Sequence, residues 1–298
     1  TDSINTASLS VSNINISNGT VIVSPNLTIG NGSTFNLSGG ALTGPGVLAL
    51  DSGCTFNWTG GSMAGTGIIN INAGATFNMG AGDLFFGDTR TINNYGTWNW
   101  TGGTFYYYNS APITNNYGTF NISTDADIYQ YNATTGSFNN MSTGIINKIG
   151  SPNQETSFNS FNNFTNAGTI NLNSGRLRIT TRSVHTGTIN IGFGAFMNFS
   201  SGTAIFNTGT ILSGTGTLSF ESGTDSINTA SLSVSNINIS NGTVIVSPNI
   251  TVINGNTFNL SGGTLTSPAT MEFESGSIFN WTGGSMAGNG ITTINAGG

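Results

Sequence analysis

The sequence predicts an all-β protein that folds as a parallel β-solenoid, with about 21–22 residues per coil and three short strands in each coil. Three observations predict this fold. The composition disfavours helices, an aromatic motif returns every 21 or 22 residues, and glycine-rich turns separate short alternating stretches of apolar and polar residues.

The composition is dominated by four small or polar residues. Gly, Asn, Thr and Ser together supply 166 of the 298 residues. Charged residues make up 5% of the chain, against about 25% in an ordinary soluble protein. Hydrophobic residues still reach 36% and include 19 Phe, whereas disordered chains combine low hydrophobicity with high charge. The chain is therefore expected to fold, and to fold as strands.

Charge and cysteine content exclude several classes of function. A net charge of −6 with only five Lys and Arg argues against nucleic acid as a partner. No run of about 20 apolar residues is present, so no membrane span is expected. Cys54 is the single cysteine, which rules out intrachain disulfides and cysteine-based metal sites. Calcium-binding repeat motifs are also missing. We expect no cofactor and no metal.

A long repeat organises the chain. Residues 1–26 recur unchanged as 224–249, and residues 1–75 match 224–298 at 57 of 75 positions. We therefore predict one continuous solenoid over 1–298, without caps. In it, 1–223 form one long repeat unit and 224–298 begin a second copy.

A shorter repeat gives the coils. The string Thr-aromatic-Asn recurs with its aromatic residue at spacings of 21, 21, 21 and 22. In one coil, strands are expected at 55–58, 62–64 and 68–71, separated by turns rich in Gly. The stretches 121–168 and 212–256 are irregular, and each is long enough for two coils.

Comparison of the two copies predicts which side chains point inward. Val47-Leu48-Ala49-Leu50 becomes Thr270-Met271-Glu272-Phe273, so alternate positions stay apolar, as a strand with one buried face requires. The same parity predicts a core stack of aromatic residues made of Phe35, Phe56, Phe77, Trp98, Phe120, Phe258 and Phe279.

The repeated run Gly-x-Thr-Phe-Asn-Trp-Thr-Gly-Gly-Ser-Met-Ala-Gly, with Asn-Asn-Tyr-Gly-Thr at 93–97 and 115–119, resembles repeats of large secreted bacterial surface proteins. These are the filamentous-haemagglutinin-like adhesins and the autotransporter passenger domains. The resemblance implies a right-handed β-helix that is secreted, extracellular or on the cell surface and works as a stalk, fibre or adhesive surface. It carries over no functional residue.

Catalytic patterns are weak. Asp125 and Asp127 share the parity of an expected strand over 124–129, the arrangement that acid–base cleavage of a sugar needs. Asp83 and Asp88 precede Arg90 in an earlier coil. The Asn-Thr-Asp and Gly-His-Gly strings of polygalacturonase-like enzymes are absent. We predict no catalytic residue and no enzyme activity.

Tyrosines supply a candidate binding surface. Phe105-Tyr106-Tyr107-Tyr108 reads as one strand, so two of its four side chains must point outward. An outward stripe of Tyr would stack on sugar rings or on a neighbouring fibre, and packing at a widened coil explains the same residues. Both interpretations stay open for the candidate surface residues Tyr106, Tyr107, Tyr108, Tyr129 and Tyr131.

Arg176, Arg178, Arg182 and His185 form the only basic cluster. Arg176 and Arg178 alternate with apolar residues and are expected on one outward face. There they would contact an anionic glycan, pair with an acidic patch of a neighbouring chain, or simply face solvent and discourage lateral aggregation.

Asparagine and threonine repeat in step with the coils. Stacked Asn side chains can form hydrogen-bonded ladders between coils, and the same residues lie in glycosylation sequons. The residues concerned are Asn36, Asn57, Asn99, Asn121 and Asn280. Regular outward rows of Thr and Asn also raise the possibility of an ice-binding array.

We predict a non-catalytic structural segment of an extracellular fibre, stalk or matrix protein that stacks end to end. Its partner would be itself, either as a homopolymer or as tandem copies in one long chain. The alternatives are a glycan-binding adhesin surface, with cell-surface glycans as partners, and an ice-binding Thr/Asn array.

Overall fold

The computed structural model describes residues 1–4, 7–9, 11–132, 135–159, 162–230 and 232–297. They form two compact units, unit 1 (Thr1–Asn147 and Thr156–Phe164) and unit 2 (Lys148–Glu155 and Thr165–Gly298), and each is described by itself. The chain passes between the units within three strands, β21 (Ile145–Lys148), β22 (Glu155–Asn159) and β23 (Asn163–Asn166).

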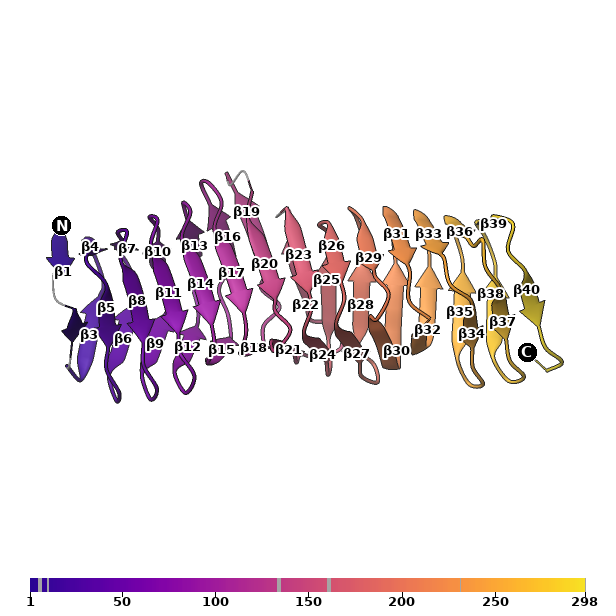
Figure 1. Ribbon diagram of the computed structural model, residues 1–298, viewed down its shortest axis with the longest axis horizontal. Helices are drawn as coiled ribbons and strands as arrows, with labels where there is room; N and C mark the ends of the chain where they lie inside the picture. The colour runs from indigo at the N-terminus through magenta and orange to yellow at the C-terminus, as the bar shows by residue number, and fades with distance from the viewer. Residues whose placement is uncertain (5–6, 10, 133–134, 160–161, 231, 298) are drawn as a thin grey trace. The chain divides into compact units, whose positions relative to one another are not determined.

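All the regular secondary-structure elements of the described residues are β-strands, and the strands of successive coils pair in parallel. The predicted all-β fold, the parallel β-solenoid and three strands per coil are confirmed. No helix of the length and apolar character needed to cross a bilayer occurs in these residues. Figure 1 shows successive coils of each unit lying side by side.

Unit 1 has three files of strands, each strand pairing with its counterpart one coil away. The first file is β3 (Asn13–Ile16), β6 (Thr34–Leu37), β9 (Thr55–Trp58), β12 (Thr76–Met79), β15 (Thr97–Trp100) and β18 (Thr119–Ile122). The second is β1 (Asp2–Ile4), β4 (Thr20–Val23), β7 (Ala41–Thr43), β10 (Gly61–Met63), β13 (Leu84–Gly87), β16 (Phe105–Tyr108) and β19 (Ile128–Tyr131). The third is β2 (Ser8–Leu9), β5 (Leu27–Ile29), β8 (Val47–Leu50), β11 (Ile68–Ile71), β14 (Thr91–Asn94), β17 (Ile113–Asn116) and β20 (Ser137–Asn140).

Unit 2 repeats this arrangement with two long strands, β30 (Ile211–Phe220) and β32 (Leu232–Ile239). Each of them takes the place of two consecutive shorter strands of the other coils. The register of the β30–β32 pairing shifts between Gly214 and Thr217. The shorter strands are β24 (Thr169–Leu172), β25 (Arg176–Ile179), β26 (Ser183–His185), β27 (Thr188–Ile191), β28 (Phe196–Phe199), β29 (Ala204–Phe206), β31 (Thr224–Ile227), β33 (Thr243–Val246), β34 (Ile250–Val252), β35 (Thr257–Leu260), β36 (Thr264–Thr266), β37 (Met271–Phe273), β38 (Ile278–Trp281), β39 (Ser285–Ala287) and β40 (Thr292–Ile294).

The core of unit 1 is a stack of aromatic rings along the first file. Phe35, Phe56, Phe77, Trp98 and Phe120 are fully buried, and their strands pair them in register. Neighbouring ring centroids lie 4.7 to 5.3 Å apart. Each coil thus buries its apolar face against the next coil, which a single coil has no means of doing.

In unit 2, two further residues of the expected stack also pair in register. Phe258 of β35 is 1% exposed, and Phe279 of β38 lies opposite it with a centroid distance of 6.0 Å. Phe279 is half-buried and stacks on Phe273 at 4.7 Å.

Asparagine ladders run along the files, as the sequence predicted. In unit 1 the Nδ2 of each Asn donates to the Oδ1 of the Asn one coil earlier, at 2.7 to 3.0 Å. This outer ladder consists of Asn15, Asn36, Asn57, Asn78, Asn99, Asn121 and Asn147. Unit 2 has the same arrangement in Asn238, Asn259 and Asn280. The Nδ2 atoms that a glycan would occupy are therefore ladder donors.

A second ladder lies inside unit 1. Asn94 donates to Asn116 at 2.7 Å, and Asn116 donates to Asn140 at 2.8 Å, with all three side chains buried. In this inner ladder each Asn donates to the Asn of the following coil, whereas in the outer ladder each Asn donates to the Asn of the preceding coil. The nearby turns stack tightly, because a Cβ at Gly118 would collide with the carbonyl oxygen of Gly96. Glycine is therefore required at this step of the Asn-Asn-Tyr-Gly-Thr string.

We expect Asn116→Ala to lower the free energy of unfolding of unit 1 by about 2–4 kcal/mol, because it removes the two buried amide–amide hydrogen bonds that join Asn116 to Asn94 and to Asn140. Asn15→Ala, at the exposed end of the outer ladder, should cost less than about 0.5 kcal/mol. Urea unfolding followed by the fluorescence of the unit 1 tryptophans measures both. Equal effects of the two substitutions would contradict a stabilising role of the buried ladder.

Candidate functional site

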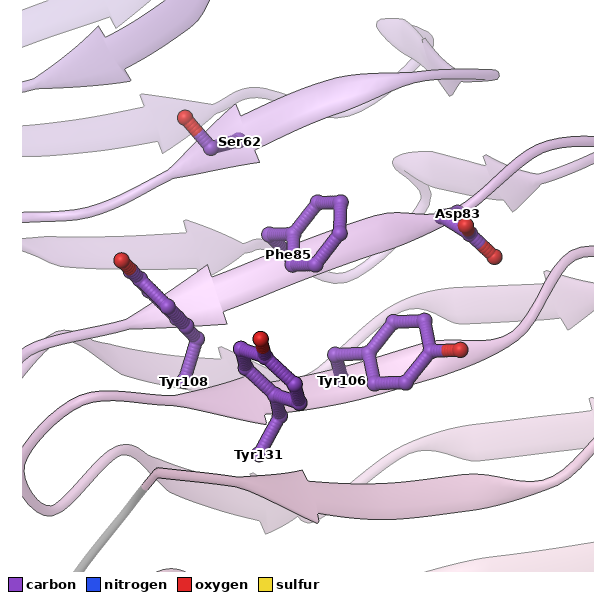
Figure 2. Close-up of a pocket in the computed structure, with 6 residues that line it drawn as sticks. All are labelled: Ser62, Asp83, Phe85, Tyr106, Tyr108 and Tyr131. Carbon is purple, nitrogen blue, oxygen red and sulfur yellow. The ribbon is translucent and has the colours of Figure 1, made fainter.

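A hollow on the outer face of β10, β13, β16 and β19 is the candidate site on unit 1, and we call it the aromatic groove (Figure 2). Its volume is about 550 Å³. The lining residues are Ser62, Asp83, Phe85, Tyr106, Tyr108 and Tyr131. This volume lies within the range of small-ligand sites, which is about 300–1,000 Å³.

The four rings of the groove form two pairs. Phe85 and Tyr106 are nearly parallel, with an interplanar angle of 13° and centroids 5.1 Å apart. Tyr108 and Tyr131 are also nearly parallel, at 17° and 6.0 Å. The two pairs meet almost at right angles, at 78° between Phe85 and Tyr108 and 77° between Tyr106 and Tyr131. Figure 2 shows the first pair broadside and Tyr108 edge-on.

Strand alternation positions these rings. In β16, Phe105 and Tyr107 are buried while Tyr106 and Tyr108 face outward. Parallel pairing then places Tyr106 beside Phe85 on one side and Tyr129 on the other. Phe85 is part of the surface that the sequence interpretation missed. Its signal was available, since two successive Phe residues in one strand must point to opposite faces.

Tyr107 corrects one prediction. It was expected as a candidate surface residue, but it is fully buried because it shares the inward parity of Phe105. Its hydroxyl donates to Oγ1 of Thr114 at 2.8 Å. Burial raises the pKa of Tyr107 far above its ordinary value, so the residue stays a neutral donor inside the unit.

Small residues stand opposite two of the groove rings. Ser62 stands opposite Phe85 in β10, and Gly87 stands opposite Tyr108 in β13. A Cβ at Gly87 would lie 3.0 Å from the carbonyl oxygen of Tyr108 and 3.1 Å from its ring. The absence of a side chain at Gly87 therefore lets Tyr108 lie close to β13.

Polar groups border the rings. The lining includes the exposed Asp83 carboxylate, the Ser62 hydroxyl and three tyrosine hydroxyls. Tyr129, which is 41% exposed, continues the first pair at 6.1 Å from Tyr106. Its hydroxyl donates to the Asp127 carboxylate, and this hydrogen bond raises the pKa of Tyr129.

A separate tyrosine pair lies in unit 1 away from the groove lining. Tyr95 is 45% exposed and stacks on Tyr117 with centroids 4.7 Å apart. Neither residue lines the groove. This pair provides a matched comparison for any role of the groove tyrosines.

The two carboxylates considered for acid–base chemistry do not share a strand. Asp125 and Asp127 lie in the turn before β19, where the Thr124 hydroxyl accepts from the Ala126 amide. Asp127 accepts from the Ser157 amide at 2.6 Å and from Tyr129. The expected strand parity at 124–127 is therefore wrong, because a hydrogen-bonded turn replaces the strand.

Arg90 is buried in unit 1, where its Nε donates to the Ala64 carbonyl at 2.6 Å and its Nη2 to the Gly44 carbonyl at 3.0 Å. Burial lowers the pKa of Arg90 to about 10, so it remains charged at neutral pH. Asp88 instead accepts from the Gly65 amide and from Asn109. Both side chains thus tie neighbouring coils together.

The basic cluster has its partners within unit 2. Arg178 forms ion pairs with Glu155 and Glu221, each at 2.7 Å. Arg176 lies over the Phe196 ring at 4.4 Å from its centroid. The hydrogen bond to Glu155 raises the pKa of Arg178. Arg178 is thus engaged within the unit, and Arg182 is exposed.

His185 does not belong to the basic face. It is fully buried in β26 and stacks on Phe206 with centroids 4.8 Å apart. Burial lowers the pKa of His185 to about 3, so the imidazole is neutral at physiological pH. The strand parity that exposes Arg176 and Arg178 in β25 points His185 inward in β26.

Metal ligands, the single cysteine and the Thr file are the remaining candidates. Within the described ranges, no three His, Cys, Asp or Glu side chains come together in a way that would hold a metal ion. Cys54 is buried, and burial raises its pKa to about 11, so its sulfur stays a thiol at neutral pH. The Thr file considered for ice binding pairs in register, with Thr76 between Thr55 and Thr97, and is half-buried.

No protein-family model matches this chain, and neither the curated proteins nor the solved structures contain a significant match.

Asp225 makes the stability of unit 2 dependent on pH. It is 1% exposed in β31, and its Oδ1 accepts from the Ala204 amide at 2.8 Å. Burial raises the pKa of Asp225 to about 7. The neutral carboxyl of Asp225 therefore contributes to the free energy of unfolding. This contribution is complete below about pH 4, where the carboxyl is protonated in the folded and in the unfolded state, and it is lost as the pH rises towards 7.

We expect the free energy of unfolding of the unmodified chain to fall by an amount on the order of 3 kcal/mol between pH 4 and 8. In Asp225→Asn this fall should be absent, because the amide does not titrate. Thermal melts followed by circular dichroism across this range measure the effect. Asp2→Asn is the matched control, since Asp2 occupies the same place in the first repeat and is exposed. Parallel pH profiles for Asp225→Asn and Asp2→Asn would contradict the assignment.

Proposed function

We propose that this chain is a non-catalytic structural segment of an extracellular fibre, stalk or matrix protein, and that its coils stack end to end with further coils of the same kind. The observation that carries the proposal is that a coil of nearly the same sequence is covered by a further coil in the first repeat. The resemblance to secreted bacterial surface repeats supports the extracellular setting.

In the first repeat, the coil of β9–β11 is covered on both sides. Trp58 and Ile71 are fully buried there, because β9 pairs with β12 and β11 with β14. The equivalent residues, 223 positions later, are Trp281 and Ile294, which are 55% and 54% exposed. Ile291 is 64% exposed. The coil of β38–β40, which we call the open layer, therefore carries the side chains that a further coil buries in the first repeat.

The open layer has both an apolar and a hydrogen-bonding surface. In the described residues, β38, β39 and β40 each pair on one side only, with β35, β36 and β37. A further strand can pair along the other edge of β38 and of β40, as β12 and β14 pair with β9 and β11 in the first repeat. Covering a large apolar side chain there contributes about 1.5–3 kcal/mol. A further coil resembling β12–β14 satisfies both surfaces.

Ladder polarity fixes the direction of stacking. Each outer-ladder Nδ2 donates towards the preceding coil, so the Oδ1 of Asn280 faces onward and the Nδ2 of Asn15 faces back. Docking the first coil of one copy on the last coil of another continues the ladder without reversal. Such a head-to-tail contact generates an open filament.

We expect the purified chain to form filaments whose length grows with concentration, as measured by sedimentation velocity and electron microscopy. Trp281→Lys should weaken this association by at least about ten-fold, because it places a charge in the open apolar layer. Folding should be unchanged, since Trp281 is exposed.

The matched control is Ile253→Lys, which adds the same charge at a residue that is 44% exposed on a turn after β34. It should assemble as the unmodified chain does. A chain that stays monomeric at every concentration, or equal effects of the two substitutions, would count against end-to-end stacking.

A further inference from the structure

The aromatic groove on unit 1 is not explained by stacking of coils. Its rings come from the outward faces of β13, β16 and β19. They leave the inner stack of Phe56, Phe77 and Trp98 intact. A structural coil needs only its inward residues to be apolar, so the outward rings require a separate reason.

We propose that the aromatic groove binds a neutral polysaccharide, with a pyranose ring held in the corner between the two ring pairs. This proposal is independent of end-to-end stacking, because no groove residue belongs to β38–β40.

The corner suits a pyranose in shape. One ring pair meets the other at 77° to 78°, so a flat saccharide lying against one pair meets the second pair with its edge. The C–H face of a sugar is apolar and packs on aromatic carbon, while its hydroxyls project from the rim. Ser62, which lines the groove and stands opposite Phe85, leaves space for it beside the Phe85 ring.

The polar border suits the sugar hydroxyls. Tyrosine and serine hydroxyls both donate and accept, and the Asp83 carboxylate accepts. Figure 2 shows Asp83 at one end of the groove and Tyr108 at the other. The groove therefore offers partners on both sides of a bound ring. Leu or Ile side chains would offer none.

Charge selects the class of polysaccharide. Asp83 is the single charged residue of the lining, no cation lines the groove, and the whole chain carries a net charge of −6. A carboxylate or sulfate on the sugar would be repelled by Asp83 without a compensating cation. Neutral hexose or pentose polymers are therefore the ligands, and uronic acid polymers are excluded.

The test is native affinity electrophoresis of the full chain in gels that contain hydroxyethylcellulose, galactomannan, xylan or polygalacturonate. Running it in the Trp281→Lys background separates sugar binding from filament formation. We expect at least one neutral polymer to retard the protein and polygalacturonate to have no effect. Retardation by none of the neutral polymers would overturn the proposal.

Tyr131→Ala should weaken the retardation about ten-fold, because it removes half of the second ring pair from an exposed position. Tyr95→Ala is the matched control, since Tyr95 is 45% exposed and stacked on another tyrosine outside the groove. Asp83→Asn should allow polygalacturonate to bind. Equal losses of retardation in Tyr131→Ala and Tyr95→Ala would overturn the proposal. A fall in sedimenting mass caused by Tyr131→Ala alone would also overturn it, because it would show that the groove is a contact between copies of the chain.

Discussion

In-register parallel pairing between neighbouring coils is the constraint on which the rest of this structure depends. It places Phe56 against Phe77 and Asn57 against Asn78, so a single register forms both the ring stack and the amide ladder. A slip of one residue would turn the apolar face outward and break both at once. The same pairing brings Tyr106 beside Phe85 on the opposite face of the sheet. Core, ladder and groove are thus three results of one register.

The sequence was sufficient for the fold because its signals were local and repeated. The spacing of Thr-Phe-Asn strings gave the coils, and the change from Val47-Leu48-Ala49-Leu50 to its later copy gave the inward parity. Where this periodicity fades, prediction was weaker. The merging of strands into β30 and β32 depends on a register shift near Gly214 that no repeat marks. The turn at Asp125 and Asp127 depends on local side-chain hydrogen bonds.

The groove was only partly predictable, and the reason is parity. Tyr106, Tyr108 and Tyr131 were anticipated as surface residues, yet Tyr107 was grouped with them although the strand rule places it inside. The contribution of Phe85 needed the pairing of β13 with β16, which joins residues 21 positions apart. Angles between rings, and the close approach of Tyr108 to Gly87, arise only when coils pack against each other. No single strand contains that information.

The identity of residues 1–26 and 224–249 has a consequence for how the chain folds. A strand that can pair with a neighbour about 21 residues away also meets an identical sequence 223 residues away. Loop-closure entropy favours the nearer partner by about 2 kcal/mol, or roughly thirty-fold. Coils therefore assemble in sequence order from whichever one forms first, and the copies avoid exchanging partners within one molecule. The proximity of the next coil along the chain, rather than a difference in sequence, thus prevents strands of one copy from pairing with those of the other while the chain folds.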